Sequence, residues 1–414
     1  MHETKFGLAA GAHARSGDGF WRPDFTIRDE TDLAAAMGAA PATSARRRDL
    51  RNALVVALLL SAWIDPDRWI AYARDRNAYT AWKGYFGPMA SYELMLWAVQ
   101  SLETVGLIEH RKTRPGPAKR FRSTLRATDE LIAASPLTHV NQLRRVIWEP
   151  IRLKDFDRKL TRYAETLQTR SWRADAQEQN EALLGLRLGF TLPEWEEDGH
   201  GIFRQKRRVL NPARNQTYRV FNFDWCYGGR WYGPWWQGLN STERAEIRIN
   251  DQSVCEVDYR YLHPTLLAAL DGRNLGSEDP YAIDGISRND VKTAFNTLIN
   301  ADTEMSAVLS LQNTLSPTQS YSPRQQALHV VQAVKARHTD FADAFGTGRG
   351  RQLQCVDGHM CSEVQRIMRR AGHPVLSVHD SFIVEASQKD LLERVMDDVL
   401  QRAQRRLANG TWVS

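Results

Sequence analysis

The chain has 414 residues, 42% hydrophobic and 25% charged, a composition that fits a folded protein of two or three domains and excludes a disordered or fibrous one. Lys and Arg total 55 against 49 Asp and Glu, which gives a net charge of +6. The basic residues cluster in runs at 46–51, 111–126 and 204–219, as a surface that follows phosphates requires.

Four cysteines, Cys226, Cys255, Cys355 and Cys361, lack C-x-x-C or Cys/His ligand spacing, which favours a reducing compartment. The first residues lack the basic-then-apolar pattern of a secretory signal. The apolar run at 53–64 is too short to span a bilayer and predicts a buried helix. We therefore expect a cytoplasmic protein with no membrane partner.

Residues 1–46 are rich in Gly, Ala, Ser and Thr and predict a flexible N-terminal arm. Residues 47–130 predict helices at 49–64, near 68–74 and at 91–105, then two short strands joined by a basic turn with Pro and Gly at its tip. This order resembles a winged helix, a module that contacts either the DNA backbone or another protein. By that resemblance, the DNA contacts would come from basic residues of the hairpin: Arg111, Lys112, Arg114, Lys119 and Arg120.

The segment at 131–210 has spaced apolar residues that predict a helical, thumb-like connector. Nine aromatic residues follow between 218 and 236. We expect Phe221 and Phe223 to pack in the core of a strand. Trp231 and Tyr232 stand beside Gly and Arg and are the better candidates for stacking on unpaired bases.

Two stretches place an aspartate after an extended segment. Asp258 follows Val254-Cys255-Glu256-Val257, and Asp380 follows Leu376-Ser377-Val378-His379. Neighbouring strands that each end in a carboxylate bring the two acids together, where their oxygens suit hard cations. The pattern predicts a two-metal site for phosphoryl transfer.

A basic helix is predicted between the two acids, at 288–300. Arg288, Lys292, Asn296 and Asn300 recur every four residues and therefore share one face of that helix. This face offers two cations to a polyphosphate and two amides to a sugar or base.

Together the three patterns resemble motifs A, B and C of the family A DNA polymerases and the related single-subunit phage-type RNA polymerases. The resemblance implies that Asp258 and Asp380 bind metal with the carbonyl of Tyr259, and that Arg288 and Lys292 hold the incoming triphosphate, with Lys292 also catalytic. The segment at 228–239 resembles the Gly-Arg stretch before motif A, so Arg230 and Gln237, with His379 of motif C, would contact the primer–template.

The departures from the family pattern concern the sugar. His263 stands where family A enzymes carry a Glu that excludes the 2′-hydroxyl, and Asn296 and Asn300 replace an aromatic residue and a Tyr. Motif C continues with Ser381 instead of Glu. His263 and Asn296 could hydrogen-bond a 2′-hydroxyl, so the residues do not separate dNTP from rNTP use.

We therefore expect an α+β protein with a right-hand palm at 211–414, an antiparallel sheet with helices, a helical fingers insertion at about 275–350, and an N-terminal winged helix. The expected activity is template-directed nucleotidyl transfer by a minimal DNA polymerase without proofreading, with primase ability, using two Mg²⁺ ions, with Mn²⁺ as an alternative. Two alternatives stay open: a primase or RNA polymerase that uses rNTPs, and a non-enzymatic winged-helix initiator or defence protein with an inactive palm.

Overall fold

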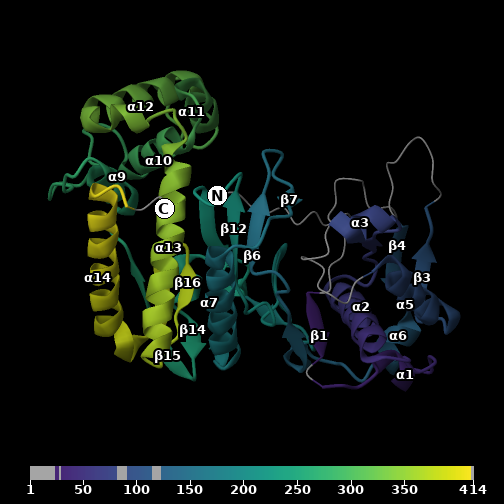
Figure 1. Ribbon diagram of the computed structural model, residues 1–414. Coiled ribbons are helices and arrows are strands. Elements are labelled where there is room, and N and C mark those ends of the chain that lie inside the picture. The colour runs from purple at the N-terminus through teal and green to yellow at the C-terminus, as the bar shows by residue number, and fades with distance from the viewer. Residues whose placement is uncertain (1–23, 28, 82–90, 114–122, 412–414) are drawn as a thin grey trace.

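The computed structural model describes residues 24–27, 29–81, 91–113 and 123–411. It is a mixed α+β structure with several antiparallel sheets, which confirms the expected class at this coarse level. An N-terminal unit lies on one side of the molecule in Figure 1, and the C-terminal helices lie on the other.

The N-terminal unit is a small sheet packed on helices. Its elements run in the order α2 (Ala45–Ile64), β2 (Ile70–Tyr72), α3 (Arg76–Ala81), α5 (Tyr92–Thr104), β3 (Ile108–Arg111) and β4 (Ser123–Ala127). The sheet has the order β2-β4-β3, and both pairings are antiparallel. The helix expected near 68–74 is wrong: these residues include β2, because Ile70 and Tyr72 pair with β4 and Tyr72 is buried in the core.

The core of this unit reaches beyond residue 130. α6 (Asp129–Ala134), η1 (Val140–Gln142) and β5 (Leu143–Arg145) follow, and β5 pairs with β1 (Phe25–Ile27). Buried Leu131, Leu143 and Ile202 belong to the same cluster as α2. The part of the expected arm after residue 23 is also ordered, because β1 and α1 (Leu33–Ala36) bury Ile27 and Leu33.

The helical connector expected at 131–210 is largely wrong. Its one long helix is α7 (Leu167–Leu184), and the other elements are mostly strands: β6 (Ile151–Lys154), β7 (Leu160–Thr161), β8 (Leu188–Phe190), β9 (Glu196–Glu197), β10 (Phe203–Gln205) and β11 (Arg208–Leu210). The apolar residues used for the prediction do not share one buried stripe, because Phe156 and Leu167 are both 84% exposed.

Two sheets form the centre of the molecule. One has the order β13-β12-β6-β7, with β12 at Tyr218–Asn222 and β13 at Gly228–Tyr232. The other is antiparallel with the order β16-β17-β15-β14-β8, formed by β14 (Ile247–Ile249), β15 (Gln252–Asp258), β16 (Leu376–Val378) and β17 (Ser381–Glu385). The short η2 (Trp235–Gly238) and α8 (Ser241–Arg244) lie between β13 and β14 in the chain.

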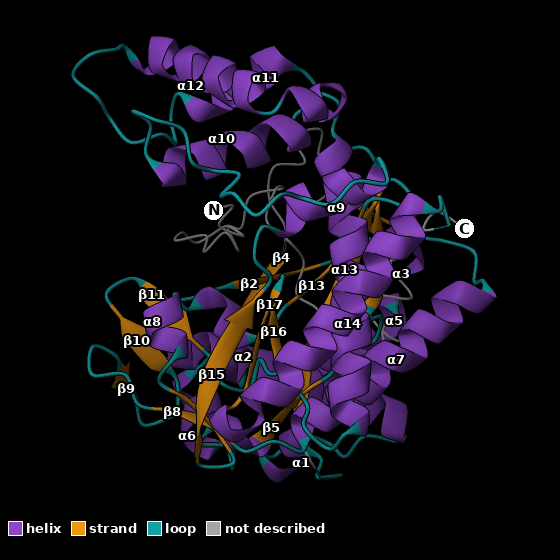
Figure 2. Ribbon diagram, turned by 90° about the vertical axis from the view of Figure 1, so that its left-hand side faces the viewer, coloured by secondary structure: helices purple, strands orange, loops and turns teal. Residues whose placement is uncertain are grey.

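Long helices cover one face of this five-stranded sheet. They are α13 (Arg349–Arg370) and α14 (Lys389–Ala408), which follows η4 (Ala386–Gln388); Figure 2 shows them beside β15 and β17. Phe382 and Val384 point to the helices, whereas Ile383 packs in the cluster on the opposite face, as strand alternation requires.

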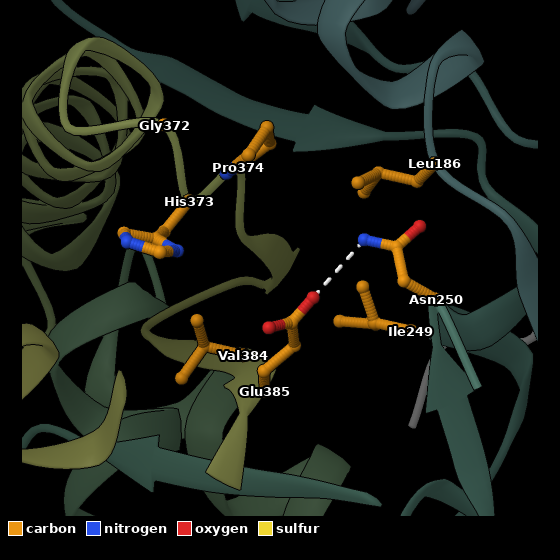
Figure 3. Close-up of a pocket in the computed structure, with 8 residues that line it drawn as sticks. All are labelled: Leu186, Ile249, Asn250, Gly372, His373, Pro374, Val384 and Glu385. Carbon is orange, nitrogen blue, oxygen red and sulfur yellow. Dashed lines mark hydrogen bonds between the residues drawn. The ribbon is translucent and has the colours of Figure 1, made fainter. Parts of the chain in front are cut away.

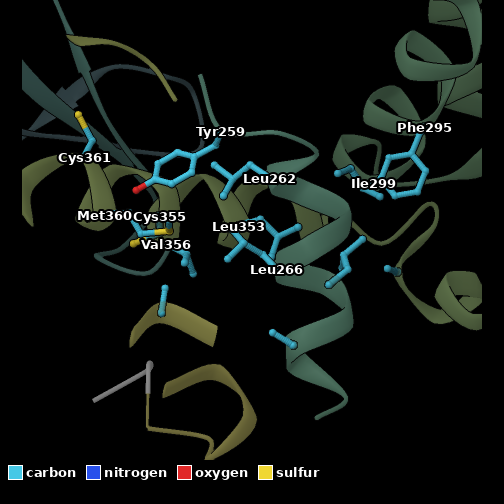
Figure 4. Packing of buried hydrophobic residues seen from close by; sticks show 14 of the residues in the cluster. Tyr259, Leu262, Leu266, Phe295, Ile299, Leu353, Cys355, Val356, Met360 and Cys361 are labelled. Carbon is cyan, nitrogen blue, oxygen red and sulfur yellow. The ribbon is translucent and has the colours of Figure 1, made fainter. Parts of the chain in front are cut away.

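A further group of helices lies beyond one end of the sheet (Figures 1 and 2). It consists of α10 (Arg288–Asn300), α11 (Glu304–Leu311), α12 (Pro323–Arg337) and η3 (Thr339–Ala344), and α9 (Leu262–Leu270) connects it to β15. Phe295 and Ile299 of α10 pack in one cluster with Leu266 of α9 and Leu353 of α13, so α10 shares a core with the helices of the sheet (Figure 4).

Among the helices of the described ranges, none combines the length and the apolar character needed to cross a bilayer.

Candidate active site

Asp258 and Asp380 lie side by side, as their positions after two strands predict. β15 and β17 are antiparallel neighbours, and Asp258 pairs with Ser381, the residue after Asp380. The amide of Tyr259 donates to the carbonyl of Asp380 at 3.4 Å. Asp380 occupies the two-residue turn between β16 and β17, in which His379 has a φ of +59°. The tight turn therefore sets the position of this carboxylate relative to β15.

The pKa of Asp258 reflects its surroundings. Partial removal of water from around its carboxyl, and then the charge of Asp380, raise this pKa to about 7, whereas the ammonium of Lys292 on α10 lowers it; the residue as a whole still reaches solvent. Two acids and one lysine from three separate elements therefore interact at one place. Such a carboxylate pair is stabilised in its ionised form by a cation.

A third carboxylate, which the sequence patterns did not single out, stands next to this pair. Glu256 is two residues before Asp258 on β15 and accepts from Arg244 through both oxygens, at 2.8 Å each. The hydroxyl of Ser381 donates to Glu256 at 2.5 Å. Where the family pattern has an acid directly after the second aspartate, this chain has a serine bonded to an acid of the neighbouring strand.

Helix α10 presents its predicted basic face near the acids. Lys292 is exposed, and its charge influences Asp258. Arg288, one turn earlier, forms an ion pair with Asp279 at 2.6 Å, and its guanidinium lies over the rings of Tyr261 and Tyr281. The two predicted phosphate ligands thus differ: Lys292 interacts with the acids, and Arg288 is held by the preceding loop.

His263 joins α9 to α10 and β13 through a chain of polar contacts. Its Nε2 lies 3.3 Å from an Arg230 nitrogen, and its Nδ1 lies 3.2 Å from Oδ1 of Asn296. Because a guanidinium only donates, Nε2 accepts and the proton is on Nδ1, which donates to Asn296. Burial and then the charge of Arg230 lower the pKa of His263, which is consistent with a neutral ring.

Asp357 of α13 anchors this network and was not predicted. It is 2% exposed and accepts from Nε of Arg230 at 2.5 Å. An aspartate inside an amphipathic helix carries no periodic signal of its own, so only its buried arginine partner identifies it.

Three other predicted residues are held by internal bonds. The amide of Gln237 donates to the carbonyls of Trp231 and Ser377, so Gln237 braces the chain after β13. Asn300 accepts from Gln354 and thereby links α10 to α13. Tyr259 is buried and its hydroxyl donates to the carbonyl of Met396.

The aromatic predictions need correction. Trp231 is 1% exposed and donates to Ser362, so it is a core residue and cannot stack on a base. Tyr232 packs edge-on against His379, the predicted primer–template contact, at 5.7 Å between ring centroids. Phe221 is buried as expected, but Phe223 lies just after β12 with a φ of +67°.

Two of the five predicted wing residues lie in the described part of the chain. Arg111 stacks on Trp69 at 3.8 Å, and Lys112 pairs with Glu103 at 3.1 Å. Arg114, Lys119 and Arg120 lie outside the described residues.

The residues near Asp258 fit a Mg²⁺ site that takes only a few of its ligands from the protein. Within the described ranges, no three His, Cys, Asp or Glu side chains gather as a metal-binding group. Mg²⁺ commonly uses only one or two carboxylates and takes its remaining ligands from water and substrate phosphates. Asp258 and Asp380 match that arrangement, because they supply two carboxylates and the pKa of Asp258 is raised.

One pocket lies at the opposite end of the same strands. Glu385 and Ile249 line it with His373, and Asn250 donates to Glu385 at 3.0 Å (Figure 3). Glu385 pairs with Val254, four residues before Asp258 on β15, so this pocket is separate from the acid pair.

No family model matches the chain, and no curated protein sequence matches it.

Proposed function

We propose that this chain is a metal-dependent nucleotidyltransferase that extends a nucleic acid on a template, with DNA synthesis as its leading activity. The observation that carries the proposal is the meeting of Asp258, Asp380 and Lys292 from β15, the β16–β17 turn and α10. Two acids can hold metal ions and a lysine can bind phosphates, so this group suits a polyphosphate substrate that binds together with metal ions.

Each residue has a distinct part in the proposed reaction. Asp258 and Asp380 would hold two Mg²⁺ ions, which when bound stabilise charge on the attacking and leaving oxygens. Lys292 offers its ammonium to the phosphates of the nucleotide and neutralises charge on the departing pyrophosphate. Arg230, fixed by Asp357, and the neutral His263 shape the wall beside Asn296, where the sugar would lie.

The N-terminal unit supports a DNA partner by its element order. A helix, a strand, two helices and a hairpin, with the sheet order β2-β4-β3, are the parts that a winged helix requires. We propose that this unit binds duplex DNA beside the catalytic centre, with Arg111 and Lys112 at the end of β3 where the turn of the hairpin begins.

The test is nucleotide incorporation on a primed template with Mg²⁺. Asp258→Asn and Asp380→Asn should each lower the rate by roughly 10²-fold or more, because single preorganised electrostatic groups have effects of that size. Asp251→Asn, at an exposed aspartate just before β15 and so at the other end of that strand from Asp258, is the matched control and should leave the rate unchanged. Substantial synthesis by either site variant would overturn the assignment.

A second candidate activity, RNA synthesis or priming with rNTPs, is favoured by the hydrogen-bonded pair of His263 and Asn296. Running the assay with dNTPs and rNTPs side by side, with and without a primer, separates the two activities. His263→Glu should shift preference several-fold toward dNTPs if this pair accommodates a 2′-hydroxyl. Rejection of rNTPs by the wild type at several orders of magnitude would rule out this role.

A further inference from the structure

Phe156 is a large apolar residue exposed at the edge of the sheet β13-β12-β6-β7. It lies in the short turn between β6 and β7, and 84% of its surface is exposed. Its ring stacks on Phe223, with centroids 4.6 Å apart and planes inclined by 19°. Exposing a phenylalanine side chain to water costs about 2 kcal/mol relative to burying it, so the exposure of Phe156 needs a physical reason.

The turn that carries Phe156 is well braced. The amide of Asp155 donates to the carbonyl of Lys159, the amide of Arg158 donates to the carbonyl of Asp155, and the amide of Lys159 donates to the Asp155 carboxylate. Lys159 also pairs with Asp157. These contacts hold the backbone on both sides of Phe156, so the ring is presented by a preformed turn.

Phe223 is held in a strained conformation beneath it. Its φ of +67° is rare for a bulky residue and costs on the order of 1–2 kcal/mol. Its amide donates to the carbonyl of Lys154 at 2.6 Å, which ties the residue to the end of β6. Tyr227 packs edge-on against Phe223, and the guanidinium of Arg351 lies 5.9 Å from its ring.

Contacts through α13 connect the Phe156–Phe223 stack to the C-terminal end of α10, which is the end farther from Lys292. Gln352 of α13 donates to the hydroxyl of Tyr227, and two residues later Gln354 donates to Asn300 at the C-terminal end of α10. Arg351 pairs with Asp302, just beyond α10. The stack is therefore linked, through α13, to the C-terminal end of the helix whose first turns carry Arg288 and Lys292.

The charge around the stack suits a polyanion. The segment 154–162 carries four basic residues, Lys154, Arg158, Lys159 and Arg162, against two acids, Asp155 and Asp157. Aromatic faces beside cations bind single-stranded nucleic acid by stacking on bases and attracting phosphates.

We infer that Phe156 and Phe223 form a base-stacking platform for the unpaired template strand. This inference rests on the proposed function, because that function supplies a single-stranded template. The exposed face of Phe156 receives a base, Phe223 supports the ring from below, and the basic residues of the turn accept the backbone.

The test measures binding without catalysis, in EDTA, by fluorescence anisotropy of a labelled oligothymidylate. Phe156→Ala should weaken binding at least about fivefold, because stacking on one aromatic residue has that effect or more. Phe156→Trp should retain binding. Leu167→Ala is the matched control, since Leu167 is also 84% exposed but lies at the start of α7 and should not change affinity.

A second oligonucleotide, with the same backbone but abasic, separates stacking from charge. Phe156→Ala should bind it as the wild type does. Equal oligothymidylate affinity for Phe156→Ala and wild type would overturn the platform, as would an equal loss with the abasic strand. Since no nucleotide is turned over, these outcomes are independent of the incorporation assay: an inactive wild type that still needs Phe156 for binding would contradict the proposed function alone.

Discussion

At the scale of single residues, three arginine–carboxylate pairs support the acid site and the strands near it. Arg230 pairs with Asp357, Arg244 with Glu256, and Arg208 with Glu243. Glu243 also accepts hydrogen bonds from the indole NH of Trp195 and the backbone amide of Asn240. These donors, the Arg208 bond above all, lower the pKa of Glu243 from 4.5 to about 2.

This shift predicts a specific dependence of stability on pH. A folded pKa below the unfolded one stabilises the protein above about pH 5, and the contribution is lost as the pH falls through 4.5 toward 2. Glu243→Gln should lower the free energy of unfolding by about 1–3 kcal/mol at pH 7. In urea unfolding, the difference from wild type should shrink on acidification; Glu246→Gln, at an exposed neighbour, should show no such difference. A difference that stays constant down to pH 3 would contradict the account.

At the scale of elements, α13 and β13 approach each other more closely than any side chain would allow. A Cβ on Gly358 would lie 2.3 Å from the carbonyl oxygen of Gly229, which itself has a φ of +77°. Two glycines thus let the helix lie directly on the strand that carries Arg230. The same close contact places Asp357, the residue before Gly358 on α13, within reach of that arginine.

Gly358→Ala should therefore separate the helix from the strand. We expect a loss of about 1–3 kcal/mol in unfolding free energy, as for other overpacked cores, because the clash is with backbone that cannot rotate away. Gly276→Ala is the control, since nothing lies within 4 Å of its Cβ. Thermal denaturation of both variants measures the effect, and equal melting temperatures would show that α13 can shift without cost.

At the scale of the whole molecule, the basic hairpin and the acid pair belong to different units. Arg111 and Lys112 lie in the N-terminal unit, whereas α14 lies on the opposite side of the molecule in Figure 1. If the N-terminal unit binds duplex DNA, its cations displace counterions from the DNA phosphates. The cations on α14 would not contact the DNA and would displace none.

Replacing both Arg111 and Lys112 by Ala should weaken duplex binding and flatten the slope of log K against log salt by about 0.9 for each lost phosphate contact. Arg394→Ala with Arg405→Ala, both exposed on α14, is the matched control. Titrations over a range of salt concentrations give the slopes. Identical slopes for the two double variants would mean that Arg111 and Lys112 contact something other than DNA backbone.

Much of the C-terminal half could be predicted from local patterns. Helix α10 begins and ends where its stripe predicts, at Arg288–Asn300, and the hairpin β16–β17 turns at His379 and Asp380. Both signals are strong because periodicity and turn geometry act over a few neighbouring residues. Strands of two to four residues, as in 143–161, are too short to show a period, and their apolar residues were taken for a helix.

The sequence by itself determined which acids follow strands and which cations share a helical face, because those properties depend only on residue order. Tertiary structure alone decided which distant residues meet: Asp357 with Arg230, Glu256 with Ser381, and Phe156 with Phe223. The partners in these pairs are between 67 and 127 residues apart, by their residue numbers. Contacts over such separations arise from strand pairing and helix packing, which no local pattern contains.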